Sequence, residues 1–176
     1  DHNGVSKSPM NLAMFLYAAE HVSRICRVLK QPGAHMLCVG VGGSGRQSLT
    51  RLAAALEEFE LFQIEVAKGY GTNEWRDDLR KVLLMAGAEG KDVVFLFTDT
   101  QIVQENFLED INNILNSSEV PNLWKSEDLG TIENALRPIM SQQRLPLTKN
   151  AMNAYFITRV RSNLHCVLAM SPVSDE

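Results

Sequence analysis

Four short, almost wholly apolar runs, separated by segments with helical periodicity, constrain the fold of this 176-residue chain more than any other feature. Between the runs, apolar residues recur every three or four positions, which indicates amphipathic helices. This alternation predicts an α/β fold whose parallel sheet is covered by helices on both faces. The predicted strands are 35–39, 61–66, 92–97 and 165–170, and the predicted helices are 9–29, 46–58, 74–86, 103–115, 132–140 and 152–160.

The length predicts one domain, taken over residues 1–176, or one large domain plus part of another, and the composition argues against several classes of partner. Lys and Arg total 17 against 21 Asp and Glu, a net charge of −4, whereas nucleic-acid binders usually carry a basic excess. No apolar run approaches the roughly 18 residues that a membrane-spanning helix needs, so no membrane partner is expected. The three cysteines (Cys26, Cys38 and Cys166) lie far apart in apolar stretches, which favours reduced, buried thiols over disulfides or a zinc site.

A glycine-rich turn follows the first predicted strand directly and leads into a predicted helix at Arg46. A strand, such a turn and a helix form the arrangement in which backbone N–H groups hold phosphate. Two motifs overlap here. One is the dinucleotide fingerprint Gly-x-Gly-x-x-Gly, for which Glu65 lies 20 residues on. The other is a P-loop with Arg46 for its Lys and Gln47 for its Ser or Thr. The turn consists of Gly40, Val41, Gly42, Gly43, Ser44 and Gly45.

Two features favour the P-loop interpretation. A whole helix precedes the first strand, whereas a dinucleotide-binding fold usually begins at that strand. The strand-like segment 92–99 also closes on Thr98 and Asp99, as a Walker B strand closes on acidic residues. The P-loop therefore extends over residues 40–48, and its candidate nucleotide-binding residues are the six residues of the turn with Arg46, Gln47 and Ser48.

The chain resembles the large subdomain of an AAA+ module of a dynein heavy chain, most closely the fourth module of an axonemal type. The segments that carry the resemblance are 40–49, 70–79, 113–123, 160–165 and 170–172. The resemblance implies an αβα sandwich with a five-stranded parallel sheet, stacked with five sister modules into a ring. It also implies that the helical lid of the module lies outside this sequence.

The resemblance assigns altered residues to the catalytic positions. Arg46 stands for the phosphate-binding Lys, and Gln47 stands for the residue that ligates Mg²⁺. Thr98 stands for the Mg²⁺-linked Asp and Asp99 for the catalytic Glu; in the alternative alignment Asp99 is the Mg²⁺-linked acid and Thr100 replaces the base. Gln47, Thr98 and Asp99 are thus weak Mg²⁺ candidates. Ser171, at the end of the strand-like segment 165–171, takes a polar sensor position.

These changes predict a module that binds ADP or ATP, holds Mg²⁺ weakly, and hydrolyses nucleotide slowly or not at all, in a structural or regulatory role. Whether the module is itself catalytic stays open. The resemblance implies neighbouring AAA+ modules, other dynein subunits and, through a stalk outside this sequence, the microtubule as partners. It implies a place in the cytoplasm and cytoskeleton, in the axoneme of a cilium or flagellum. The alternatives are an NAD-type oxidoreductase, a free-standing P-loop NTPase and a scaffold that binds no nucleotide.

Overall fold

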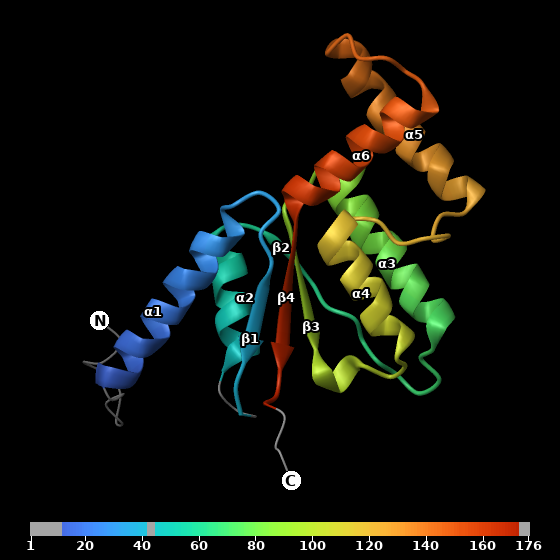
Figure 1. The fold of residues 1–176 in the computed structure, drawn as a ribbon. Coiled ribbons are helices and arrows are strands. Elements are labelled where there is room, and N and C mark those ends of the chain that lie inside the picture. The colour runs from blue at the N-terminus through green and yellow to red at the C-terminus, as the bar shows by residue number, and fades with distance from the viewer. Residues whose placement is uncertain (1–11, 42–44, 173–176) are drawn as a thin grey trace.

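The computed structural model describes residues 12–41 and 45–172, which form a layered α/β structure (Figure 1). Within these ranges four parallel strands make one sheet in the order β1-β4-β3-β2. The strands are β1 (Met36–Val39), β2 (Glu60–Phe62), β3 (Val93–Thr98) and β4 (Leu164–Met170). The helices are α1 (Leu12–Leu29), α2 (Arg46–Leu56), α3 (Thr72–Gly87), α4 (Asn106–Ser117), α5 (Ser126–Gln142) and α6 (Lys149–Asn163), and a 3₁₀ turn, η2, covers Asp99–Gln101. None of these helices is both long and apolar enough to cross a membrane.

The expectation of a five-stranded sheet is wrong: the part of the chain that the structure describes has four strands, one for each apolar run in the sequence. The fifth strand came from the family resemblance and had no apolar run to form it. The long segment between β3 and β4 supplies no further strand either, because it forms η2 and the three helices α4, α5 and α6.

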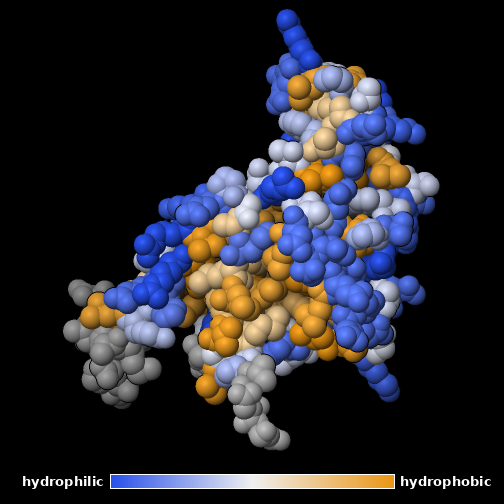
Figure 2. Space-filling view, viewed as in Figure 1, coloured by the Kyte–Doolittle hydropathy of each residue, from blue (hydrophilic) through white to orange (hydrophobic). Residues whose placement is uncertain are grey.

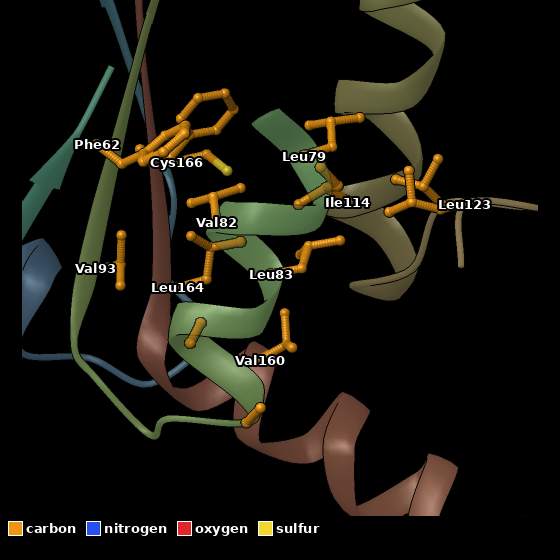
Figure 3. Packing of buried hydrophobic residues seen from close by; sticks show 14 of the residues in the cluster. Phe62, Leu79, Val82, Leu83, Val93, Ile114, Leu123, Val160, Leu164 and Cys166 are labelled. Carbon is orange, nitrogen blue, oxygen red and sulfur yellow. The ribbon is translucent and has the colours of Figure 1, made fainter. Parts of the chain in front are cut away.

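Strand β3 lies at the centre of the fold and explains why its sequence is apolar at every position. Successive side chains of a strand point to opposite faces of the sheet. Val93, Phe95 and Phe97 join the larger core cluster, which packs under helices α3 to α6, whereas Val94 and Leu96 join the cluster under α1 and α2. All six residues of β3 are buried. Figure 3 shows part of the larger cluster, in which side chains from α3, α4 and α6 meet the sheet.

Trp75 anchors the larger cluster through both its ring and its N–H group. Its side chain is fully buried and stacks on Phe107 with ring centroids 4.5 Å apart. The indole Nε1 donates a hydrogen bond of 2.9 Å to Oδ2 of Asp110, which is itself buried. A buried indole N–H needs such an acceptor, so this Asp secures the contact between α3 and α4.

Strand β1 departs from the prediction that helices cover every strand on both faces. It forms one edge of the sheet and pairs with β4. Leu37 and Val39 on β1 are 61% and 59% exposed. Figure 2, in the same view as Figure 1, shows apolar side chains gathered over this part of the sheet. The apolar sequence of β1 is therefore matched by burial on one face only.

Two element bounds differ from prediction for reasons visible in the hydrogen bonds. Strand β2 shares only Leu61 and Phe62 with the predicted 61–66, because beyond Phe62 the backbone bonds outside the sheet: the Ile64 carbonyl accepts a hydrogen bond from Nε2 of Gln101. Helix α5 begins six residues before the predicted 132–140. The carboxylate of Asp128 accepts the backbone N–H of Lys125 and so stabilises the new helix start. Pro138 lies inside this helix.

Close packing at the end of α3 predicts a large effect of one added methyl group. A Cβ at Gly87 would lie 2.3 Å from the Phe156 ring and 2.7 Å from Val160 Cγ2, both buried side chains. Gly87→Ala should therefore lower the free energy of unfolding by about 1–3 kcal/mol, measured by urea denaturation of the 176-residue chain.

Gly130 in helix α5 is the matched control, because nothing lies within 4 Å of a Cβ built there. Gly130→Ala should raise the free energy of unfolding by about 0.5–1 kcal/mol, since Gly is the costlier residue in a helix interior. Equal effects of the two substitutions would show that packing between α3 and α6 is not tight.

Candidate functional site

A cleft of about 460 Å³ lies where the carboxyl ends of β3 and β4 meet the N-terminus of α2. In open parallel sheets, ligands bind at this edge, beyond the carboxyl ends of the strands. The cleft gathers residues from the P-loop, the Walker-B-like strand and β4. Its lining consists of Gly45, Arg46, Gln47, Ser48, Arg51, Thr98, Asp99 and Ala169.

Gly45 is the N-cap residue of α2 and lines the cleft at the start of this helix. It caps the helix with φ 74° and ψ 10°, the left-handed conformation that glycine adopts without strain, and no side chain caps this end. The first helical hydrogen bond runs from Leu49 N to the Gly45 carbonyl at 2.8 Å. The N–H groups of residues 46–48 therefore have no acceptor within the helix, and such groups attract anions.

The rest of the predicted P-loop is described in part. Gly42, Gly43 and Ser44 lie outside the described residues. The N–H of Gly40 donates to the Met170 carbonyl at 3.2 Å, which ties the end of β1 to the end of β4. Val41 is 72% exposed.

Arg46, at the position of the P-loop Lys, contacts the end of β4. Its Nη1 donates to the same Met170 carbonyl that accepts from Gly40. The guanidinium group thus lines the cleft while its hydrogen bond is made to backbone, and its positive charge lies at the N-terminus of α2. A cation and a helix N-terminus together favour an anion at this place.

Asp99 binds backbone with both carboxylate oxygens. Oδ1 accepts the N–H of Thr100 at 2.9 Å, and Oδ2 accepts the N–H of Ser171 at 2.8 Å. The Ser171 hydroxyl and then its N–H lower the pKa of Asp99 below its ordinary value, with smaller contributions from the Thr100 N–H and the charge of Arg46. Asp99 is therefore ionised and fastens the segment after β4 to the end of β3.

Each of the three predicted Mg²⁺ donors makes a hydrogen bond within the chain. Thr98 is 3% exposed, and its Oγ1 lies 2.9 Å from Oγ1 of Thr100. Oε1 of Gln47 accepts from Nε2 of Gln63 at 3.4 Å, toward the end of β2. Asp99 is engaged as described above, and the described ranges contain no group of three or more His, Cys, Asp or Glu that could hold a metal ion. Mg²⁺ bound here would have to take most of its octahedral shell from water and phosphate, and a protein ligand would have to exchange a hydrogen bond for the metal.

The structure brings most of the predicted site together and adds one residue. Gly45, Arg46, Gln47, Ser48, Thr98 and Asp99 all line the cleft, and Ser171 joins it through Asp99. Arg51 was not predicted. It also lines the cleft, and its Nη2 donates to Oε1 of Gln63 at 2.6 Å. The signal was its spacing, because a residue four positions after Gln47 shares its helix face.

The sheet order argues against the dinucleotide interpretation. In the dinucleotide-binding fold the strand that carries the ribose-binding acid lies next to the first strand, so that acid and glycine turn meet on one ligand. Here β1 and β2 are opposite edges of the sheet, with β4 and β3 between them. Glu65 follows β2 and lines a different cleft, beside Tyr70 and Lys81.

The parallel sheet, the left-handed glycine at the start of α2 and the polar ends of β3 and β4 define an α/β domain of the P-loop class. The family described as "P-loop containing dynein motor region D4" matches residues 10–176, and the chain belongs to this family. It is 49% identical to "Dynein axonemal heavy chain 1" of Homo sapiens over 175 residues and 51% identical to "Dynein axonemal heavy chain 2" of Mus musculus over 167 residues. These alignments cover 99% and 95% of this chain, which spans 4% of the length of each relative.

The bonds of Asp99 predict how stability depends on pH. Because its pKa is lower in the folded chain than its ordinary value of 3.8, the folded state binds fewer protons than the unfolded state. The resulting stabilisation is complete above pH 3.8 and is lost as the pH falls through the folded-state pKa. The difference in free energy of unfolding between wild type and Asp99→Asn should be constant over roughly pH 5 to 7 and shrink in acid, measured by urea denaturation. A difference that stays constant into acid would contradict the assignment.

Proposed function

We propose that this chain is the large subdomain of the fourth AAA+ module of an axonemal-type dynein heavy chain. In this proposal it binds ADP or ATP at the start of α2 and hydrolyses nucleotide slowly or not at all. The observation that carries the proposal is a contrast within one cleft: N–H groups at the start of α2 and two arginines are suited to phosphate, while the groups that would hold Mg²⁺ and activate water are hydrogen-bonded within the chain.

The phosphate-binding half of the proposal rests on backbone geometry and charge. The uncapped N-terminus of α2, with Gly45 in the left-handed conformation, offers N–H donors at a helix terminus. Arg46 and Arg51 add two cations to the same cleft. A nucleoside diphosphate or triphosphate carries the charge and the oxygen atoms that such donors bind.

The slow-hydrolysis half rests on the acids. Phosphoryl transfer depends on positioning and electrostatic stabilisation, with Mg²⁺ bridging the phosphates and a polar group orienting the attacking water. Asp99 is the one carboxylate among the described residues that line the cleft, and both of its oxygens bind backbone N–H groups. Thr98 is uncharged and buried. With the Asp99 carboxylate bound to backbone and no second acid beside it among the described residues, the site would stabilise the transition state of hydrolysis only weakly.

The proposed setting rests on the resemblance to dynein heavy chains and on the word axonemal in the names of the relatives. As part of a dynein heavy chain, the module would contact neighbouring AAA+ modules of the same chain and, in the assembled motor, other dynein subunits. The microtubule would be reached through a stalk outside this sequence, and the place of action would be the cytoskeleton of an axoneme. Nucleotide at this cleft would then serve the ring as a structural or regulatory ligand.

Gly45→Val tests the binding half directly. Among the described residues, chain neighbours aside, no heavy atom lies within 4 Å of a Cβ built at Gly45, so the obstacle there is the left-handed φ of 74°. A left-handed conformation costs an L-residue about 1–2 kcal/mol, and a β-branched one more. The substitution should weaken ADP binding about tenfold or more in isothermal titration calorimetry, because the first turn of α2 would reorient.

Gly45→Asn is the matched control, since Asn tolerates the left-handed conformation. It should retain most of the affinity for ADP, and Asp99→Ala should leave the affinity near that of wild type. If Asp99→Ala removes binding as fully as Gly45→Val, a Mg²⁺-linked acid and not the backbone dominates the site.

A further inference from the structure

Two side chains of opposite charge, one from each side of the cleft, bind the backbone at the point where the chain leaves β4. The guanidinium of Arg46, on α2, donates to the Met170 carbonyl, and the carboxylate of Asp99, after β3, accepts the Ser171 N–H at 2.8 Å. The two backbone groups belong to one peptide unit, the bond between Met170 and Ser171. We call this arrangement the exit clasp.

The two ends of the exit clasp differ in their relation to the cleft. Asp99 is secured by a second backbone bond, from the Thr100 N–H, and neither of its bonds is made to α2. Arg46 is the residue after Gly45, at the helix N-terminus where an anion binds, and its guanidinium lines the cleft. One end of the clasp therefore lies within reach of a bound phosphate.

A phosphate group is a stronger partner for Arg46 than a neutral carbonyl. The bond to the carbonyl already has a charged donor, but phosphate adds the attraction of opposite charges and takes two parallel bonds from a guanidinium. The Met170 carbonyl keeps a donor when Arg46 leaves, because the Gly40 N–H bonds to it at 3.2 Å. Exchange of partners thus leaves no buried acceptor without a bond, which keeps its cost low.

We propose that Arg46 is a switch residue that divides its bonding between the Met170 carbonyl and nucleotide phosphate, so that phosphate binding opens one end of the exit clasp. The inference rests on the proposed function, since it needs nucleotide in the cleft. Asp99 is the fixed end: it positions the segment after β4 in both states. Nucleotide occupancy is thereby transmitted from α2 to the segment that leaves the sheet at β4.

The sequence offers a direct probe of the clasp. Among its Met residues, Met140 and Met170 precede Ser, so labelling with ¹³C-carbonyl Met and ¹⁵N-Ser yields two carbonyl–amide correlations in an NMR spectrum. The Met170–Ser171 signal reports the Arg46 bond in its carbon dimension and the Asp99 bond in its proton dimension. The Met140–Ser141 signal lies in α5 and serves as an internal control for the fold.

ADP should shift the Met170 carbonyl carbon to lower frequency, because a lost hydrogen bond shields that carbon, and should leave the Ser171 proton near its position. Arg46→Met should give the same carbon shift without ADP and no further shift with it. Asp99→Ala should move the Ser171 proton and spare the Met170 carbon, whereas Asp99→Asn, which keeps an acceptor, should move the proton less. The Met140–Ser141 signal should stay fixed throughout.

Calorimetry on the same samples separates the two proposals. Binding of ADP with an unmoved Met170 carbon would overturn the switch and leave the proposed function standing. Absence of ADP binding to the wild-type chain would overturn both. An unshifted Met170 carbon in Arg46→Met, beside an unchanged Met140–Ser141 signal, would also overturn the switch, because it would show that Arg46 does not bind this carbonyl.

Discussion

The parallel pairing of β3 with β4 is the contact on which the rest of the structure depends. It aligns Val93 with Leu164 and continues to Thr98 and Ala169, so the two strands end side by side. Every residue of β3 is buried, and the apolar side chains of this strand alternate between the two core clusters. The strand pair β3–β4 therefore separates the two clusters and contributes to both. The same register places Asp99 beside Ser171 and creates the edge where α2 meets the sheet.

At this edge of the sheet, the groups suited to binding phosphate differ from the groups that hydrolysis would need. The cleft is suited to phosphate for two reasons. Gly45 adopts the left-handed conformation at the start of α2, and Arg46 and Arg51 bring positive charge to the cleft. Hydrolysis would need acids held ready for a metal ion and a water molecule. The carboxylate of Asp99, which lines the cleft, instead accepts a hydrogen bond from the Ser171 N–H, just after β4. A group that stabilises the fold in this way is costly to release for catalysis.

Local patterns predicted the order of elements, because each strand is an apolar run and each helix has a three- to four-residue period. They could not predict the partner of Asp99, which lies 72 residues away, or that of Arg46, which lies 124 residues away. Both contacts arise from strand pairing and have no local signal. The exposure of Leu37 and Val39 was missed for the same reason: an apolar strand looks alike in sequence at the centre and at the edge of a sheet.

Calorimetric titration of the 176-residue chain with ADP, in Mg²⁺ and again with Mg²⁺ chelated, tests the central claim most directly. In the proposed site, phosphate is bound through backbone N–H groups and arginine and not through a metal ion, so ADP should bind with the same affinity in both titrations. NAD should not replace it, since β1 and β2 lie at opposite edges of the sheet. Binding of ADP that disappears when Mg²⁺ is chelated, or binding of NAD in its place, would contradict the account.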